Sequence, residues 1–219
     1  MAEKYLIKGG TVVSGNGSRK ADILIENGKI VQVSEELSAP EATLVDAKDR
    51  LVFPGFIDTH THFDLEVSGT VTADDFESGT RAAVIGGTTC ILDFATQDKR
   101  DTLQNALKKW HKKADGRCSC DYGFHMAITD WSEQVSDEVK EMFAAGVTSF
   151  KLYMTYAIKV SDGVIYQVLS RMKALGGIVG VHCENGEVID ELIAEQKRAG
   201  NYTPGAHPLS RPACVEAEA

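Results

Sequence analysis

The chain has 219 residues, of which 43% are hydrophobic and 25% charged, a composition typical of water-soluble globular proteins and not of disordered or membrane-spanning ones. Its 23 basic and 32 acidic side chains give a net charge of -9. A sequence-independent nucleic-acid binder needs a surplus of Lys and Arg, so this balance argues against that class. At about 100–200 residues per domain, the length allows one large domain or two small ones.

The N-terminus and the cysteines both indicate the cellular compartment. The segment Met1-Ala2-Glu3-Lys4-Tyr5 lacks the apolar stretch of a secretory signal, and no run approaches the ~18 apolar residues that cross a bilayer. Five cysteines without the spacing of a disulfide framework fit a reducing compartment. Cys118 and Cys120 are the one close pair, and we interpret them as part of a surface loop rather than half of a zinc site. We therefore expect a cytoplasmic protein with no membrane or nucleic-acid partner.

Residues 1–53 are predicted to form a small antiparallel β domain. Strands are expected at 5–7, 11–13, 21–26, 29–33, 43–45 and 51–53. The dipeptide Asn27-Gly28 separates two of them, and because both residues tolerate a positive φ it predicts a type I′ hairpin turn. Pro54-Gly55 then ends this domain.

Residues 54–219 show short apolar strands that alternate with amphipathic helices, a pattern typical of βαβ units around a parallel sheet. Strands are expected at 55–60, 88–94, 121–128, 147–154 and 177–183, with a further helix at 187–199. Gly146 and Gly176 stand where C-terminal glycine caps belong. Five such units suit an open doubly wound sheet or part of an eight-stranded barrel, and periodicity does not decide between them. Because the last residues, from Pro212, look like a helix start, we expect the chain to stop within a domain.

The densest group of chemically active residues is Asp58-Thr59-His60-Thr61-His62, which directly follows an apolar stretch. Strand side chains alternate between faces, so His60 and His62 point the same way and can reach one metal ion. The alternative is a pair of histidines satisfied by hydrogen bonds in a polar loop. His182, at the end of another strand, adds a third imidazole on the same side of the sheet, which favours a metal site.

The remaining histidines are given other roles. His125 lies within a strand, where we expect a structural role, and His111 and His207 are expected at the surface.

Lys151 stands in the middle of the apolar strand Ser149–Met154. Because burial of an ammonium is costly, the pKa of this amine should fall and its neutral, nucleophilic form should be populated. Such an amine can form a Schiff base with a carbonyl substrate, or add carbon dioxide to give a carbamate that bridges two metals. A lysine whose ammonium reaches past the strand end to water is the alternative.

Motifs along the whole chain resemble the dihydropyrimidinase and D-hydantoinase branch of the cyclic amidohydrolases. They are Phe53–His62, Gly69–Phe76, Gly86–Thr89, Ser149–Tyr156 and Val181–Asn185. The resemblance implies an α/β fold: an incomplete (β/α)8 TIM-like barrel at 54–219, beside part of a small β-sandwich at 1–53. It also implies a metal-dependent hydrolase.

The resemblance assigns a role to each candidate residue. By position, His60 and His62 match ligands of the more buried of two zinc ions, Lys151 matches the carboxylated lysine that bridges both, and His182 matches a ligand of the second. Tyr156 resembles the tyrosine that binds substrate and stabilises the oxyanion. The implied catalytic residues are thus Lys151 and Tyr156. The implied reaction opens a cyclic amide or imide, a dihydropyrimidine or hydantoin ring, to an N-carbamoyl amino acid through a hydroxide held between the metals.

The sequence also departs from the family. Members are considerably longer and take a further histidine and an aspartate, the expected general base, from later strands, so we expect an inactive fragment of a homotetramer. The segment 64–68, which edges the pocket, differs from the family pattern. Two alternatives are a non-catalytic scaffold protein, against which the four candidate ligands argue, and a Schiff-base lyase, which leaves the histidine pair unexplained.

Overall fold

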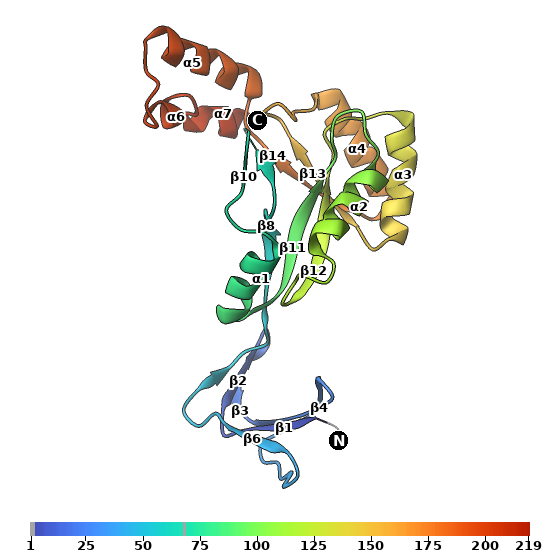
Figure 1. Ribbon diagram of the computed structural model, residues 1–219, viewed down its shortest axis with the longest axis vertical. Coiled ribbons are helices and arrows are strands. Elements are labelled where there is room, and N and C mark those ends of the chain that lie inside the picture. Colours follow the sequence, from blue (N-terminus) through green and yellow to red (C-terminus); the bar gives the residue numbers. More distant parts are fainter. Residues whose placement is uncertain (1–2, 68) are drawn as a thin grey trace. The chain divides into compact units, whose positions relative to one another are not determined.

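The structure is a computed structural model that describes residues 3–67 and 69–219 (Figure 1). Met1, Ala2 and Ser68, which belong to segments discussed above, lie outside the described residues. The chain divides into two compact units, with the boundary between Phe56 and Ile57. Within the described ranges, none of the helices has the length and apolar character that a bilayer crossing requires.

The N-terminal unit contains two small sheets. One has the strand order β5-β4-β1-β6 and the other β3-β2-β7. Asn27 and Gly28 have φ values of 51° and 73°, which confirms the expected turn with two positive φ values between β4 and β5. The strands are β1 (Lys4–Lys8), β2 (Thr11–Ser14), β3 (Gly17–Lys20), β4 (Asp22–Glu26), β5 (Lys29–Ser34), β6 (Thr43–Asp46) and β7 (Leu51–Val52).

These sheets are mixed, whereas the sequence predicted antiparallel pairing. Strand β6 pairs with β1 in parallel, and β7 pairs with β2 in parallel. The chain leaves β5 at one edge of its sheet and crosses through residues 35–42 to the other edge, where it enters β6. Because this connection crosses the sheet, β6 can run in the same direction as β1, whereas a hairpin would join neighbouring strands of opposite direction.

The second unit is built on a five-stranded sheet with the order β14-β13-β12-β11-β8. Pairing is parallel from β11 to β14, and neighbours in the sheet follow each other in the chain without a reversal. A doubly wound sheet reverses its order at a switch point, so the sheet is part of a barrel. The strands, β8 (Phe56–Thr61), β11 (Thr88–Thr96), β12 (Asp121–Ala127), β13 (Ser149–Tyr153) and β14 (Ile178–His182), confirm the five predicted positions.

Helices connect the strands, and a side chain caps the start of each long one. The five cap residues accept a hydrogen bond from a backbone N–H three residues on: Asp75, Thr102, Ser132, Ser161 and Asn185. Gly146 and Gly176 take positive φ values of 88° and 76° after their helices, as expected. The long helices are α1 (Phe76–Ile85), α2 (Leu103–Ala114), α3 (Glu133–Ala144), α4 (Asp162–Leu175) and α5 (Gly186–Arg198).

Three short features complete the unit. Strands β9 (Glu66–Val67) and β10 (Thr70–Val71) form a small antiparallel ribbon. Helix α6 (Ala206–Leu209) and helix α7 (Ala213–Glu218) follow α5, and α7 confirms the helix start predicted at Pro212.

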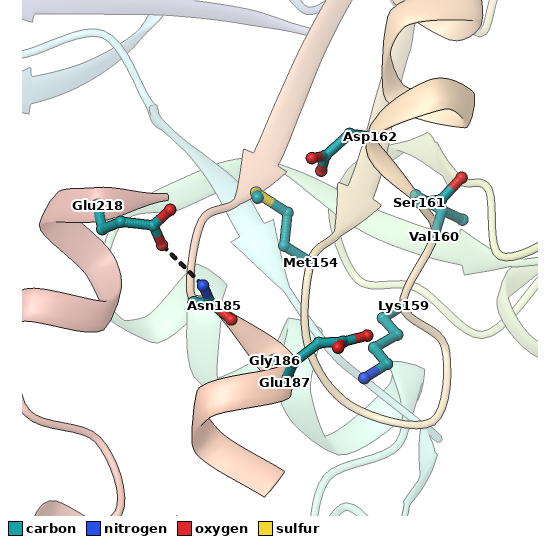
Figure 2. Close-up of a pocket in the computed structure, with 9 residues that line it drawn as sticks. All are labelled: Met154, Lys159, Val160, Ser161, Asp162, Asn185, Gly186, Glu187 and Glu218. Atoms are coloured by element: carbon teal, nitrogen blue, oxygen red, sulfur yellow. Dashed lines mark hydrogen bonds between the residues drawn. The ribbon is translucent and has the colours of Figure 1, made fainter. Parts of the chain in front are cut away.

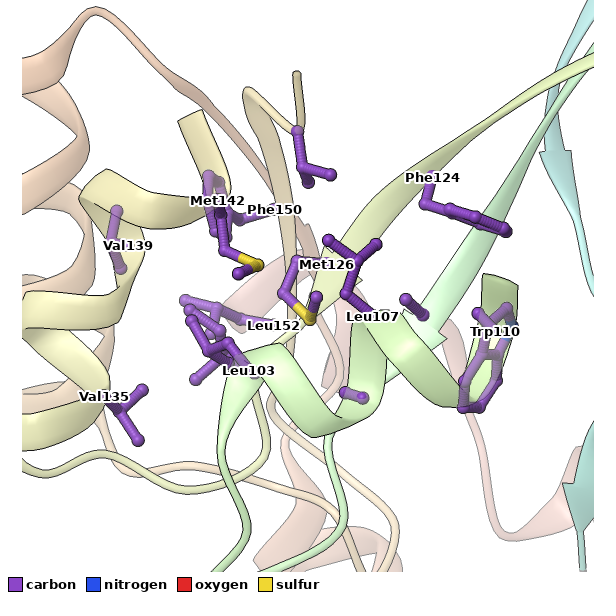
Figure 3. Packing of buried hydrophobic residues seen from close by; sticks show 14 of the residues in the cluster. Leu103, Leu107, Trp110, Phe124, Met126, Val135, Val139, Met142, Phe150 and Leu152 are labelled. Carbon is purple, nitrogen blue, oxygen red and sulfur yellow. The ribbon is translucent and has the colours of Figure 1, made fainter. Parts of the chain in front are cut away.

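The core of the second unit lies between the sheet and helices α2, α3 and α4, which gather on one side of it in Figure 1. Figure 3 shows α2 and α3 packing their apolar side chains onto β12 and β13, where Met126 and Leu152 are fully buried. This packing holds the strands in register, so it determines where their C-terminal ends, and the polar residues there, are placed.

Candidate functional site

His60 and His62 lie together at the C-terminal end of β8. Their Nε2 atoms are 3.2 Å apart, and their ring centroids are 5.1 Å apart. Thr61 between them is buried, which is the alternation expected along a strand. The ring of Phe94 lies 4.6 Å from the His60 ring and 4.9 Å from the His62 ring. The two imidazoles therefore share one face, as predicted from their spacing.

The surroundings of both imidazoles lower their pKa and so favour the neutral form. Burial lowers the pKa of His60, and the charges of Lys151 and His125 lower it further. Burial also lowers the pKa of His62; the nearby Asp93 acts in the opposite direction, while His60 and Lys151 add to the lowering. A metal ion binds the neutral imidazole, so the electrostatics favour ligation.

The geometry of the pair suits a metal ion. Two nitrogen ligands at the usual Zn–N distance and a near-tetrahedral angle lie about 3.3 Å apart, close to the separation observed. Buried His62 Nδ1 has no hydrogen-bond partner among the described residues, so protein hydrogen bonds do not fully satisfy the pair.

Lys151 is half-buried in β13, and burial lowers the pKa of its ammonium, as predicted. The nearby Cys183 acts weakly in the opposite direction. The Nζ atom of Lys151 lies 5.2 Å from the centroid of the Tyr153 ring. Within the part of the chain that the structure describes, Lys151 forms no ion pair with a carboxylate. Its amine therefore lies without a compensating anion.

His182 belongs to a separate group at the end of β14. Its Nε2 atom is 2.6 Å from Glu184 Oε2, and the other carboxylate oxygen lies 3.7 Å from Arg211 Nε. Among the residues described, no three His, Cys, Asp or Glu side chains are arranged to hold one ion. The structure thus brings His60 and His62 together, and engages His182 with a carboxylate instead.

Tyr156 lies next to this second group. Its ring centroid is 5.3 Å from the His182 ring and 5.5 Å from Arg211 Cζ. Its φ of 68° is a left-handed conformation that costs free energy for a residue with a side chain, and such strain is concentrated at functional sites. Tyr156 lines a cavity of about 350 Å³ together with Lys99 and Arg211.

A second cavity, of about 480 Å³, opens between the loop after β13 and the start of α5 (Figure 2). Figure 2 shows Met154 and Lys159 on one side of it, and the Asn185 amide donating to the Glu218 carboxylate at 2.8 Å on the other. None of the residues predicted for the site lines it.

The structure adds functional candidates that the sequence reading missed: Asp93, Glu184 and Arg211. Asp93 is almost completely buried within the apolar strand β11. The signal that could have found it is the one that singled out Lys151, a charged residue in the middle of an apolar strand. Glu184 and Arg211 lie in loops, where a charged residue carries no such signal.

Of the other histidines, His125 is hydrogen-bonded within the sheet and His207 is exposed as predicted, whereas His111, expected at the surface, is half-buried. His125 Nε2 donates to the Thr59 carbonyl oxygen at 3.0 Å, which leaves Nδ1 to accept from the Ser149 hydroxyl at 2.5 Å. His111 is part of α2 and lies 2.9 Å from Asp115, and His207 is exposed.

The cysteine pair lies in the predicted loop, between α2 and β12, but it is more buried than expected. Cys118 and Cys120 are half-buried and pack against the core. Burial raises the pKa of the Cys118 thiol to about 11, so it is a packing residue rather than a reactive one.

Known proteins share both the sequence and the fold. The model of the amidohydrolase family matches residues 51–214. A D-hydantoinase of Geobacillus stearothermophilus is 44% identical over 217 residues, which are 98% of this chain and 46% of that protein. A dihydropyrimidinase of Dictyostelium discoideum is 46% identical over 98% of this chain and 43% of its own length.

The solved structures agree with these relatives. The crystal structure of a dihydropyrimidinase from Brevibacillus agri has a TM-score of 0.97 and 40% identity, and the match covers 99% of this chain and 48% of that one. The chain thus spans about half the length of the curated relatives it matches. The family match extends from the end of the N-terminal unit through the strands that carry the histidines and the lysine. The chain belongs to the amidohydrolase family.

Proposed function

We propose that the chain is the N-terminal half of a metal-dependent hydrolase that opens cyclic amides or imides, with dihydropyrimidine and hydantoin rings as substrates. One observation carries the proposal: the Nε2 atoms of two imidazoles lie 3.2 Å apart, and the pKa values of both imidazoles and of the nearby Lys151 amine are lowered. The names of the relatives, D-hydantoinase and dihydropyrimidinase, supply the class of substrate.

The proposed metal ligands are His60, His62, Lys151 and His182. The neutral Lys151 amine attacks carbon dioxide, which forms an N–C bond and releases one proton, and the resulting carbamate offers two anionic oxygens. Two zinc ions fit a set of imidazole and carboxylate-like donors. When bound, they would supply a water of lowered pKa and polarise the substrate carbonyl.

His182 keeps a ring nitrogen available for its proposed role. Its Nε2 atom lies 2.6 Å from Glu184, which leaves Nδ1 for a metal ion, and a histidine that ligates through one nitrogen commonly holds a carboxylate with the other. Tyr156, whose ring lies beside that of His182, is proposed to bind substrate and to donate its phenol hydrogen to the developing oxyanion. The homotetramer stays a prediction that follows from the resemblance, and the cytoplasmic location stays one drawn from the sequence.

The test replaces the lysine and measures bound metal. Lys151→Ala is expected to abolish binding of two zinc ions, with partial rescue by short carboxylic acids that replace the carbamate. Lys140→Ala, which removes an exposed lysine from α3, is the matched control and should keep the metal. Metal content is measured by elemental analysis, and ring opening is followed on dihydrouracil and hydantoin with the chain extended to the length of its relatives.

Each alternative predicts a different result. Normal metal content in Lys151→Ala would contradict the assignment of the lysine. A wild-type protein without metal or ring opening would indicate a scaffold protein. A substrate adduct trapped by borohydride would indicate a Schiff base on Lys151.

A further inference from the structure

A buried carboxylate connects the strand end that carries the histidine pair to the rest of the unit. Asp93 on β11 is 1% exposed. Its Oδ2 atom accepts hydrogen bonds from the Thr61 hydroxyl at 3.0 Å and from the Phe63 backbone N–H at 2.8 Å. Its Oδ1 atom accepts from the Phe94 backbone N–H at 2.8 Å and from the Trp110 indole N–H at 3.0 Å. The carboxylate thereby joins β8 and α2 to β11.

The two donors to Oδ2 flank His62 in the chain. Thr61 precedes it with a buried side chain, and Phe63 follows it with its backbone N–H. Fixing the residues on both sides of His62 restricts the backbone conformation of the histidine. On the other face of β11, Phe94, the neighbour of Asp93, contacts both imidazole rings at 4.6 and 4.9 Å. Two consecutive residues of β11 therefore hold the pair. Asp93 bonds to the residues on both sides of His62, and Phe94 packs against both imidazole rings.

We propose that Asp93 is a positioning residue for the metal-binding histidine pair, an inference that rests on the proposed function. It sets the orientation of the imidazoles through Thr61 and Phe63. A carboxylate is required because three of its four partners, the two backbone N–H groups and the indole N–H, can only donate. An asparagine amide would turn its NH₂ group toward at least one of these donors and lose that hydrogen bond.

The test removes two of the hydrogen-bond donors to Asp93, one at a time. Thr61→Val removes the hydroxyl donor beside His62, whereas Trp110→Phe removes the indole donor on α2. The chain, extended to the length of its relatives as in the test above, is titrated with Co²⁺ alone and followed by its visible absorption. Thr61→Val and Asp93→Asn are expected to weaken the first Co²⁺ about 10- to 100-fold, as loss of an outer-shell partner does, and Trp110→Phe by less than about threefold. Thermal unfolding of each variant is measured in parallel.

The outcomes separate positioning from stability. Unchanged Co²⁺ affinity in Thr61→Val would overturn the positioning role and leave the metal centre intact. Equal weakening in Thr61→Val and Trp110→Phe would also overturn it, because affinity would then follow stability and not the contact with the histidine segment. A wild-type chain that binds no Co²⁺ would refute the metal centre and the positioning role together. Because Thr61→Val removes a single hydroxyl, the test does not depend on whether Asp93→Asn folds.

Discussion

Asp22 in the N-terminal unit and Asp93 in the barrel unit are both buried carboxylates that are fully hydrogen-bonded, but their partners differ. Asp22 in the N-terminal unit is 3% exposed and Asp93 in the barrel unit is 1% exposed. Asp22 accepts from the Lys8 ammonium at 3.1 Å and from the backbone N–H groups of Gly9 and Leu37 at 2.8 and 2.9 Å. Asp93 has no cation within ion-pair distance among the described residues, and four uncharged donors replace it.

The difference shows that burial and full hydrogen bonding do not by themselves mark a functional carboxylate. Both groups must have partners, because an unpaired buried charge is very costly. Asp22 fixes the loop that crosses from β5 to β6 by bonding to Leu37, and this loop carries none of the candidate site residues. Asp93 bonds to the residues on both sides of His62. The two carboxylates therefore differ in where their hydrogen-bond donors lie. One donor to Asp22 belongs to a structural loop, whereas two donors to Asp93 flank a residue of the candidate site.

Among single substitutions at these carboxylates, Asp22→Asn should have the largest effect. The amide loses the ion pair with Lys8 and turns its NH₂ group toward a backbone donor, so we expect a loss of about 2–3 kcal/mol in the free energy of unfolding of the N-terminal unit. Hydrogen exchange should show faster exchange in β1 and β4, while the Co²⁺ affinity of the barrel unit stays unchanged. Faster exchange in β11, or weaker Co²⁺ binding, would show that the two carboxylates are not independent.

Lowering the pH should gradually remove the stabilisation that ionised Asp22 gives the N-terminal unit. Burial tends to raise the pKa of Asp22, but the backbone hydrogen bonds from Gly9 and Leu37 and the contact with Lys8 outweigh it, so the pKa is lowered in the folded state. The stabilisation is therefore complete above the unfolded pKa of about 3.9 and is lost as the pH falls through the lower folded value. The difference in exchange rates between wild type and Asp22→Asn should shrink below about pH 4. A constant difference down to pH 2 would contradict the assignment.

The sequence predicts those parts of the fold that depend on local chemistry. Asn27-Gly28 requires a turn with positive φ, and Lys151 in an apolar strand requires a lowered pKa, and both follow from single residues. The barrel could not be predicted in the same way, because strand order depends on contacts between elements that are distant in the chain. The parallel pairing of β6 and β7 is missing from the sequence reading for the same reason.

Helix α1 shows how packing overrides a local pattern. Its residues include Gly79 and Thr80 in the middle, which weaken the helical signal. The glycine is required by a distant contact: a Cβ atom there would collide with the ring of Phe63, which lies against Phe76 of the same helix. The site follows the same division. Lys151 and the histidine spacing can be read from the sequence, but the partners of Asp93 and the pairing of His182 with Glu184 appear only when the strands are assembled.

Glu184 is less buried than Asp22 and Asp93, so its replacement should have the smallest effect. Its side chain is 16% exposed, with Arg211 Nε at 3.7 Å and His182 Nε2 at 2.6 Å. Glu184→Gln keeps a hydrogen-bonding oxygen for His182 but loses the charge, so we expect a loss of about 1 kcal/mol and an unfolding temperature about 2–4 °C lower. Glu187→Gln, an exposed change in the first turn of α5, is the matched control.

The direct readout of this change is the histidine itself. The ¹⁵N chemical shift of His182 Nε2 should move in Glu184→Gln and stay fixed in Glu187→Gln, because Glu184 contacts that nitrogen whereas Glu187 lies exposed on α5. If the shift does not move, the imidazole is not engaged by Glu184 in solution. His182 would then have both ring nitrogens available to a metal ion, whereas a retained contact with Glu184 leaves Nδ1 as the ligand.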